Sequence, residues 1–108
     1  MSDKLTLSEA FIFLCHGARI CKAQYIDFKR PYVYICKIYR SYQVNKGTIT
    51  LKQLNELEES YLITKSEERT DAHGNTFVYY VLEDYVLYAA RNEYLRRGRE
   101  KKNERKID

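Results

Sequence analysis

The sequence has no long apolar run, few cysteines and few glycines. No stretch approaches the roughly 18 consecutive apolar residues that a membrane-spanning helix needs. The N-terminal residues Met1 to Lys4 lack the basic-then-apolar pattern of a secretory signal peptide. The four glycines are scattered, so no glycine-rich loop that could cradle a phosphate is present. These absences argue against a membrane protein and predict a protein of the cytoplasm.

The chain has only three cysteines, Cys15, Cys21 and Cys36. An odd number without paired spacing makes a poor disulfide framework, which agrees with a reducing, intracellular compartment. Together with His16 and His73, these cysteines do not reproduce a recognised zinc spacing. Cys15 and His16 are adjacent, and neighbours on a helix point apart, so they make a poor nucleophile and base. We therefore expect no metal, no cofactor and no enzymatic activity.

Charge is distributed unevenly along a chain whose length predicts a single domain. The 108 residues are 44% hydrophobic and 31% charged, as in ordinary folded proteins. The net charge is +4, but residues 19–52 contain eight basic residues and one acidic residue. Residues 53–95 contain three basic and nine acidic residues, and residues 96–108 contain seven basic and three acidic ones. This pattern predicts one surface that attracts polyanions and another that repels them.

Apolar spacing predicts two helices in the first forty residues. Thr6 and Glu9 have the spacing of a capping box, and the apolar positions that follow predict a helix of about four turns: Leu7, Ala10, Phe11, Leu14, Ala18 and Cys21. Pro31, the only proline, would suit the first turn of a second helix. One face of that helix would carry Tyr32, Ile35, Cys36 and Tyr39, and the opposite side would carry Lys37 and Arg40.

The stretch from Val44 to Leu82 predicts a helix that leads directly into a β-hairpin. The helix would run from Asn45 or Thr48 to Tyr61. In an alternative reading, residues 46–50 form a short β segment and the helix starts at Thr50. The hairpin would begin at Leu62, turn at 71–75, which is rich in turn formers, and return over 76–82.

A last helix is predicted to start at Glu83 and Asp84, where acidic side chains suit the positive end of the helix dipole. Its apolar stripe consists of Tyr85, Tyr88, Ala89 and Leu95. Residues 99–108 are expected to form a basic, frayed tail. The predicted domain therefore covers residues 1–98.

The order helix, helix, helix, hairpin, helix predicts an α+β fold of winged helix-turn-helix type, mostly helical with a two-stranded wing. Residues 54–63 (Leu54-Asn55-Glu56-Leu57-Glu58-Glu59-Ser60-Tyr61-Leu62-Ile63) resemble the helix end and wing start of winged helix-turn-helix DNA-binding domains. The sequence looks most like small regulators of the MarR-like kind, and somewhat like the winged-helix modules of phage and plasmid replication proteins. Residues 70–75 resemble their wing tip. Tyr61 stands where these families commonly have glycine, so a non-glycine residue would have to end the helix.

The resemblance implies a sequence-specific protein that binds double-stranded DNA and regulates transcription. The front of the third helix would enter the major groove and contact bases through Asn45, Lys46, Thr48, Thr50, Lys52 and Gln53. Phosphate contacts would come from flanking residues, namely Lys29, Arg30, Lys37, Arg40, Tyr42 and Arg69. The apolar stripes on the first and last helices predict a homodimer on a palindromic site. The alternatives are a protein-interaction module acting as adaptor or inhibitor, and a DNA-binding replication or partition protein.

Overall fold

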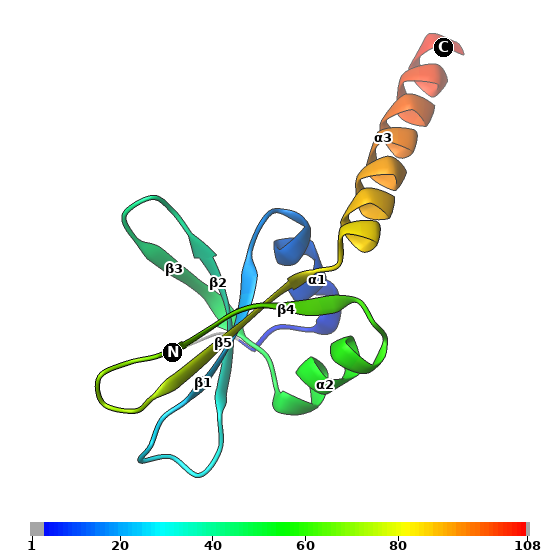
Figure 1. Cartoon of the computed structure of the whole chain (residues 1–108). Helices are drawn as coiled ribbons and strands as arrows, with labels where there is room; N and C mark the ends of the chain where they lie inside the picture. Colours follow the sequence, from blue (N-terminus) through cyan, green and yellow to red (C-terminus); the bar gives the residue numbers. More distant parts are fainter. Residues whose placement is uncertain (1–3, 108) are drawn as a thin grey trace.

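The computed structural model describes residues 4–107 and contains three helices and five strands. Along the chain these are α1 (Leu7–Cys15), β1 (Arg19–Gln24), β2 (Tyr32–Ile38), β3 (Gln43–Thr48), α2 (Leu51–Glu59), β4 (Ile63–Thr70), β5 (Thr76–Leu82) and α3 (Asp84–Ile107). The strands form one antiparallel sheet in the order β3-β2-β1-β5-β4 (Figure 1). The predicted winged helix-turn-helix is therefore wrong: the fold is α+β, but a five-stranded sheet replaces the mostly helical body and its small wing.

The second predicted helix is strand β2. Besides the helical spacing of its apolar residues, the segment has an unbroken run of aromatic and β-branched residues over 32–35, which suits a strand with two buried faces. Val33 and Ile35 pack on the helix-covered face, whereas Tyr34 and Cys36 pack on the opposite face. Because both faces are buried, the strand shows no alternation of polar and apolar residues that would distinguish it from a helix.

Helix α1 is shorter than predicted. Its capping box is confirmed: the Thr6 Oγ1 accepts from the Glu9 N–H at 3.1 Å, and the Glu9 carboxylate accepts from the Thr6 N–H at 3.1 Å. The helix ends at Cys15, and Gly17 then adopts φ +93°, which favours glycine. Cys21, expected on the helix, therefore lies in β1.

The helix that leads into a hairpin is present, but it starts later than the first reading predicted. Helix α2 begins at Leu51 with Thr50 as its N-cap, as in the alternative reading, while residues 45–48 belong to β3. The predicted hairpin is confirmed as β4 and β5, joined by a turn at 71–75. Tyr61 takes the left-handed position after α2, with φ +57°, and its carbonyl accepts a hydrogen bond from the Tyr85 hydroxyl.

Helices cover one face of the sheet. On the opposite face, side chains of the strands pack against one another. Both α1 and α2 cover the first face, where the core includes Leu14, Ile20, Ile35, Leu54 and Leu82. The second face carries a smaller cluster to which no helix within residues 4–107 contributes. Its buried members are Cys21, Ala23, Tyr34, Cys36 and Tyr79. We call this set the cysteine–tyrosine cluster.

Helix α3 extends away from the sheet (Figure 1), and the described chain measures 62 × 31 × 25 Å. Its start at Asp84, after Glu83, was predicted from the sequence. The helix continues to Ile107, through most of the segment expected as a basic tail, whereas Asp108 lies outside the described residues. No helix within residues 4–107 is long and apolar enough to cross a bilayer.

The cysteine–tyrosine cluster makes the fold sensitive to alkali. Burial raises the pKa of the Cys36 thiol to about 11, and burial also raises the pKa values of Cys21 and Tyr34. Between about pH 9 and 11 the unfolded chain therefore loses the Cys36 proton that the folded chain keeps, so stability falls as pH rises. We expect roughly 2–3 kcal/mol to be lost over that window.

Denaturant unfolding at a series of pH values measures this loss. Cys36→Ala should show a shallower decline above about pH 9 than the native sequence, although its stability at neutral pH is lower. The region from about pH 7 to 8, where both states keep the thiol proton, serves as the internal control. Equal alkaline slopes for the two proteins would contradict the assignment to Cys36.

Candidate nucleic-acid interface

The β2–β3 hairpin (residues 32–48) brings together half of the residues predicted to contact DNA. Lys37 lies on β2, and Arg40 and Tyr42 lie in the turn. Three residues expected on a recognition helix lie instead on β3, namely Asn45, Lys46 and Thr48. The predicted helical placement of these three is wrong because β3 pairs with β2 on both sides of Lys46, with Asn45 opposite Cys36 and Thr48 opposite Tyr34.

The tip of this hairpin combines stacked aromatic rings with cations. The Tyr39 N–H donates to the Tyr42 carbonyl at 2.8 Å, and the two rings stack with centroids 4.8 Å apart. The Lys37 Nζ lies 5.7 Å from the Tyr39 ring centroid, within the range of a cation–π contact. Tyr42 is 59% exposed and Arg40 is also exposed. Lys37 and Arg40 form no ion pair with any residue in 4–107, so both can bind an anion.

The base of the hairpin is shaped by a β-bulge. Cys36 pairs with Asn45 and Ile35 pairs with Gly47, which leaves Lys46 as the extra residue. The Asn45 Oδ1 accepts from the Gly47 N–H at 2.9 Å, so this amide stabilises the bulge. At Thr48 the N-terminal segment joins the edge of the sheet, where the Leu5 N–H donates to the Thr48 carbonyl at 2.8 Å.

The front of α2 is engaged in folding contacts. The Thr50 Oγ1 accepts from the Gln53 N–H at 3.0 Å, and the Gln53 Oε1 accepts from the Thr50 N–H at 2.8 Å. The Gln53 Nε2 also donates to the Leu5 carbonyl at 3.2 Å. Of the predicted base-contacting residues on this helix, only Lys52 is exposed without such a role. The Gln53 side chain thus ties the front of α2 to the N-terminal segment, and the capping groups of Thr50 and Gln53 are less available to read a groove.

The remaining predicted phosphate contacts lie elsewhere. Lys29 and Arg30 are exposed in the β1–β2 loop, at the opposite end of β2 from the hairpin tip. Arg69 lies on β4, where its Nε donates to the Glu67 Oε1 at 2.6 Å, and this hydrogen bond raises the Arg69 pKa. Because Glu67 neutralises it, Arg69 does not join the cations of β1, β2 and β3.

The strand order converts the uneven charge of the sequence into a charge difference across the molecule. Residues 19–48, which form β1, β2 and β3, contain seven basic residues and one acidic residue. Residues 49–82, which form α2, β4 and β5, contain three basic and six acidic residues. We call these segments the basic half and the acidic half. The sheet places β3 at one edge and β4 at the other, so a polyanion would approach the basic half from the β3 edge.

Sequence reasoning found Tyr42 but missed Tyr39 and Ile38 of the hairpin tip. Tyr39 had been assigned to the buried face of a helix, and Ile38 had no role. Both are exposed in the structure. The spacing Lys37-Ile38-Tyr39-Arg40, followed by Tyr42, would signal a basic and aromatic hairpin tip once the segment is known to be β. Among the side chains that the structure describes, no three from His, Cys, Asp or Glu lie where they could hold a metal ion.

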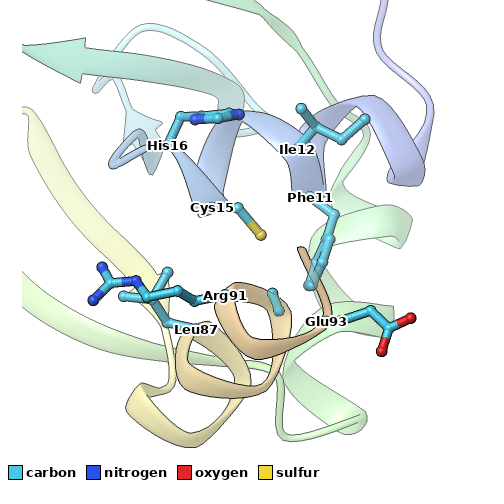
Figure 2. Close-up of a pocket in the computed structure, with 8 residues that line it drawn as sticks. Phe11, Ile12, Cys15, His16, Leu87, Arg91 and Glu93 are labelled. Carbon is cyan, nitrogen blue, oxygen red and sulfur yellow. The ribbon is translucent and has the colours of Figure 1, made fainter. Parts of the chain in front are cut away.

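A second surface feature is an apolar groove between α1 and α3, of about 570 Å³. Figure 2 shows Phe11 and Cys15 of α1 facing Leu87 and Arg91 of α3 across it. Ile12 on α1 is 57% exposed, and Tyr88 on α3 is 70% exposed. These are the two helices that were predicted to form a dimer interface.

No match marks this chain as a member of a known family. No family model matches it, and neither a curated protein nor a solved structure shows significant similarity to it. The resemblance to winged helix-turn-helix domains therefore receives no support from these comparisons. A functional assignment has to rest on the geometry of the β2–β3 hairpin and the charge distribution.

The roles of Thr50 and Lys52 can be separated by substitution. Thr50→Ala removes the N-cap of α2 and should lower the free energy of unfolding by about 1 kcal/mol. Lys52→Ala on the same helix changes an exposed side chain and should change it by less than about 0.5 kcal/mol. Urea denaturation of both variants measures the difference. Equal stabilities would show that the capping box contributes little.

Proposed function

We propose that this protein binds double-stranded DNA through the β2–β3 hairpin, with the basic half facing the DNA. The observation that carries the proposal is the hairpin tip, where Lys37 and Arg40 flank the stacked rings of Tyr39 and Tyr42. The proposal keeps the predicted ligand but replaces the recognition helix by a two-stranded ribbon.

The dimensions of a hairpin suit the ligand. The major groove of B-DNA, about 12 Å wide, admits either an α-helix or a two-stranded β-ribbon. Proteins that read DNA with strands place such a ribbon in the groove and contact base edges with its side chains. The β2–β3 hairpin carries exposed Arg40 and Tyr42 at its tip, followed by Gln43 and Asn45 along β3. Arg40 and Tyr42 offer hydrogen-bond donors to base edges. The Asn45 Oδ1, in contrast, stabilises the bulge, and the Gln43 Nε2 donates to the Tyr34 hydroxyl at 3.4 Å.

Electrostatics favours one orientation. Lys29 and Arg30 at one end of β2, and Lys37 and Arg40 at the other, supply cations at both ends of a strand next to the β3 edge. The acidic end of α2, with Glu56, Glu58 and Glu59, leads into β4 at the far edge of the sheet. A duplex approaching the β3 edge would therefore meet the cations first. Phosphate contacts of this kind set position and affinity, whereas the tip would contribute sequence preference.

The proposal predicts a salt-dependent affinity that depends on the hairpin tip. Lys37→Ala/Arg40→Ala should weaken duplex binding at least about tenfold and lower the slope of log affinity against log salt by about 1.8, since each lost phosphate contact removes about 0.9. Fluorescence anisotropy with a labelled duplex over a range of salt concentrations measures both. Lys65→Ala is the matched control, because Lys65 is an exposed lysine that pairs with Glu68 in the acidic half. Absence of duplex binding at low salt would overturn the proposal.

A second proposal concerns self-association: two copies pair through α1 and α3. It is supported by the apolar groove, whose lining includes the exposed Ile12, and by the exposed Tyr88 on α3. Two paired copies would present two β2–β3 hairpins related by a twofold axis, which would favour a DNA site with palindromic halves. A cognate site at a promoter would support transcriptional regulation, and one at a replication origin would support replication or partition. All three cysteines are free thiols, in keeping with the proposed reducing cytoplasm.

Self-association has a natural reporter in Cys15, which is half-buried in the groove, whereas Cys21 and Cys36 are fully buried. Ile12→Glu and Tyr88→Glu should each convert a dimer to a monomer in sedimentation experiments, because a charge in an apolar interface is costly to desolvate. The same variants should speed alkylation of Cys15. Ile26→Glu, an exposed isoleucine in the β1–β2 loop, is the control and should stay dimeric. A monomeric native protein at high concentration would contradict the proposal.

A further inference from the structure

We infer that a hollow in the β1–β2 loop binds one unpaired nucleotide, so that the preferred ligand is duplex DNA adjoining a single-stranded end. This inference rests on the proposed DNA binding and names a second contact within the basic half. The hollow measures about 530 Å³. Its walls are Tyr25, Phe28, Lys29, Arg30, Pro31 and Tyr32.

The walls of the hollow suit the two chemical parts of a nucleotide. Phe28 is 62% exposed, so its ring offers surface to a flat aromatic ligand, and the Tyr32 ring, whose centroid lies 5.4 Å from that of the Tyr34 ring, forms a neighbouring wall. A nucleobase stacks on such rings with little dependence on its identity. Lys29 and Arg30 are exposed and form no ion pair with any residue described, which leaves them available to a phosphate. Asp27 is the one carboxylate within the loop, and it does not line the hollow.

The loop that carries these side chains is held in place. The Gln24 Nε2 donates to the Tyr25 carbonyl at 3.2 Å and to the Phe28 carbonyl at 3.0 Å. The Tyr25 ring meets the Phe28 ring edge-on at 5.5 Å and the Phe77 ring edge-on at 5.8 Å. These contacts fix the exposed ring of Phe28 before any ligand arrives, which reduces the entropy cost of binding.

A second set of contacts fixes the loop to the neighbouring hairpin. The Ile26 N–H donates to the Asn75 Oδ1 at 3.1 Å, and Asn75 is itself held by Asp71 through its backbone N–H at 2.9 Å. The hydrogen bonds to Asp71 also lower the pKa of that carboxyl, so it stays ionised. The hollow is thus a preformed feature supported by two loops that are distant in sequence.

The ligand has to be unpaired because the faces of bases inside a duplex are covered by their neighbours. Only an unstacked base can place a free face against Phe28. The hollow and the hairpin tip lie at opposite ends of β2, whose seven residues span about 23 Å at roughly 3.3 Å each. That length corresponds to about seven base pairs at 3.4 Å per step, so one DNA molecule with a single-stranded end can reach both.

The test compares a blunt duplex with the same duplex carrying a short overhang that contains 2-aminopurine. Anisotropy measures affinity, and 2-aminopurine fluorescence reports stacking of the unpaired base. The native protein should bind the overhang duplex about tenfold more tightly than the blunt one, the size expected for one base stacked on an aromatic ring. Binding should also change the 2-aminopurine signal.

Two variants in the same loop separate the contribution of the hollow to binding from that of the rest of the surface. Phe28→Ala should remove the preference for the overhang and the change in signal, while binding of the blunt duplex stays as in the native protein. Ile26→Ala is the matched control, since Ile26 is an exposed apolar residue of the same loop that does not line the hollow. It should keep both effects. Thermal unfolding of each variant checks that the fold is retained.

The outcomes distinguish this inference from the proposed function. Equal affinity of the native protein for the two duplexes overturns the inference and leaves duplex binding intact. A preference that survives Phe28→Ala also overturns it, because the unpaired base then lies elsewhere. Failure to bind either duplex at low salt overturns the proposed function itself. In that case, binding of the isolated single strand that Phe28→Ala abolishes would still support the hollow as a nucleotide site.

Discussion

The antiparallel pairing of β1 with β5 is the contact on which the rest of the structure depends. It joins two segments that are far apart in sequence, with Ile20 opposite Tyr80 and Ala23 opposite Phe77. Without it the chain would consist of a three-stranded meander and a separate hairpin, each with an unprotected apolar face. With it, both α1 and α2 share one continuous face of five strands, and Cys21 and Tyr79 meet on the other face. Pairing two segments so far apart in sequence costs loop-closure entropy. The burial of apolar surface in the two clusters has to offset this cost.

The same pairing determines where the charges lie. The acidic hairpin is attached on one side of β1, and the basic β2 and β3 are attached on the other. The central strand therefore separates the acidic half from most of the cations, and ion pairs such as that between Arg19 and Glu67 form where the two halves meet. The cations farther from this boundary, including Lys29, Arg30, Lys37 and Arg40, remain without acidic partners among the described residues. Their availability is the physical basis of the proposed affinity for DNA.

Folding contacts also decide which surfaces remain free for a ligand. The N-terminal segment pairs with the edge of β3 at Thr48, and its Leu5 carbonyl accepts a hydrogen bond from the Gln53 side chain. Side chains at the start of α2 are consequently used in contacts that stabilise the fold. The β2–β3 hairpin, in contrast, has a tip that belongs to neither buried cluster, and its exposed Tyr39 and Tyr42 rings stack on each other beside Lys37. Surfaces of this kind are fixed in shape yet open to solvent, which suits recognition.

Local signals in the sequence predicted the elements that depend on local contacts. The capping box of Thr6 and Glu9, the turn at 71–75 and the acidic start of α3 all involve residues within a few positions of one another. The helix that leads into β4 and β5 was likewise predicted, with its start left open between two readings. For the candidate site, the sequence supplied Lys37, Arg40 and Tyr42, but it placed Lys37 and Arg40 on a helix, whereas Lys37 lies on β2 and Arg40 in the turn.

The sequence by itself therefore determined the helix caps, one hairpin and the separation of basic from acidic residues. Only the tertiary structure decided that residues 32–48 form strands. The apolar residues from Tyr32 to Tyr39 fit one face of a helix, and they fit a strand equally well if both its faces are buried. Whether both faces are buried depends on what lies beside β2, and that neighbour is β1, held by its distant partner β5. Local periodicity cannot carry this information, because burial on the second face is a property of the assembled sheet.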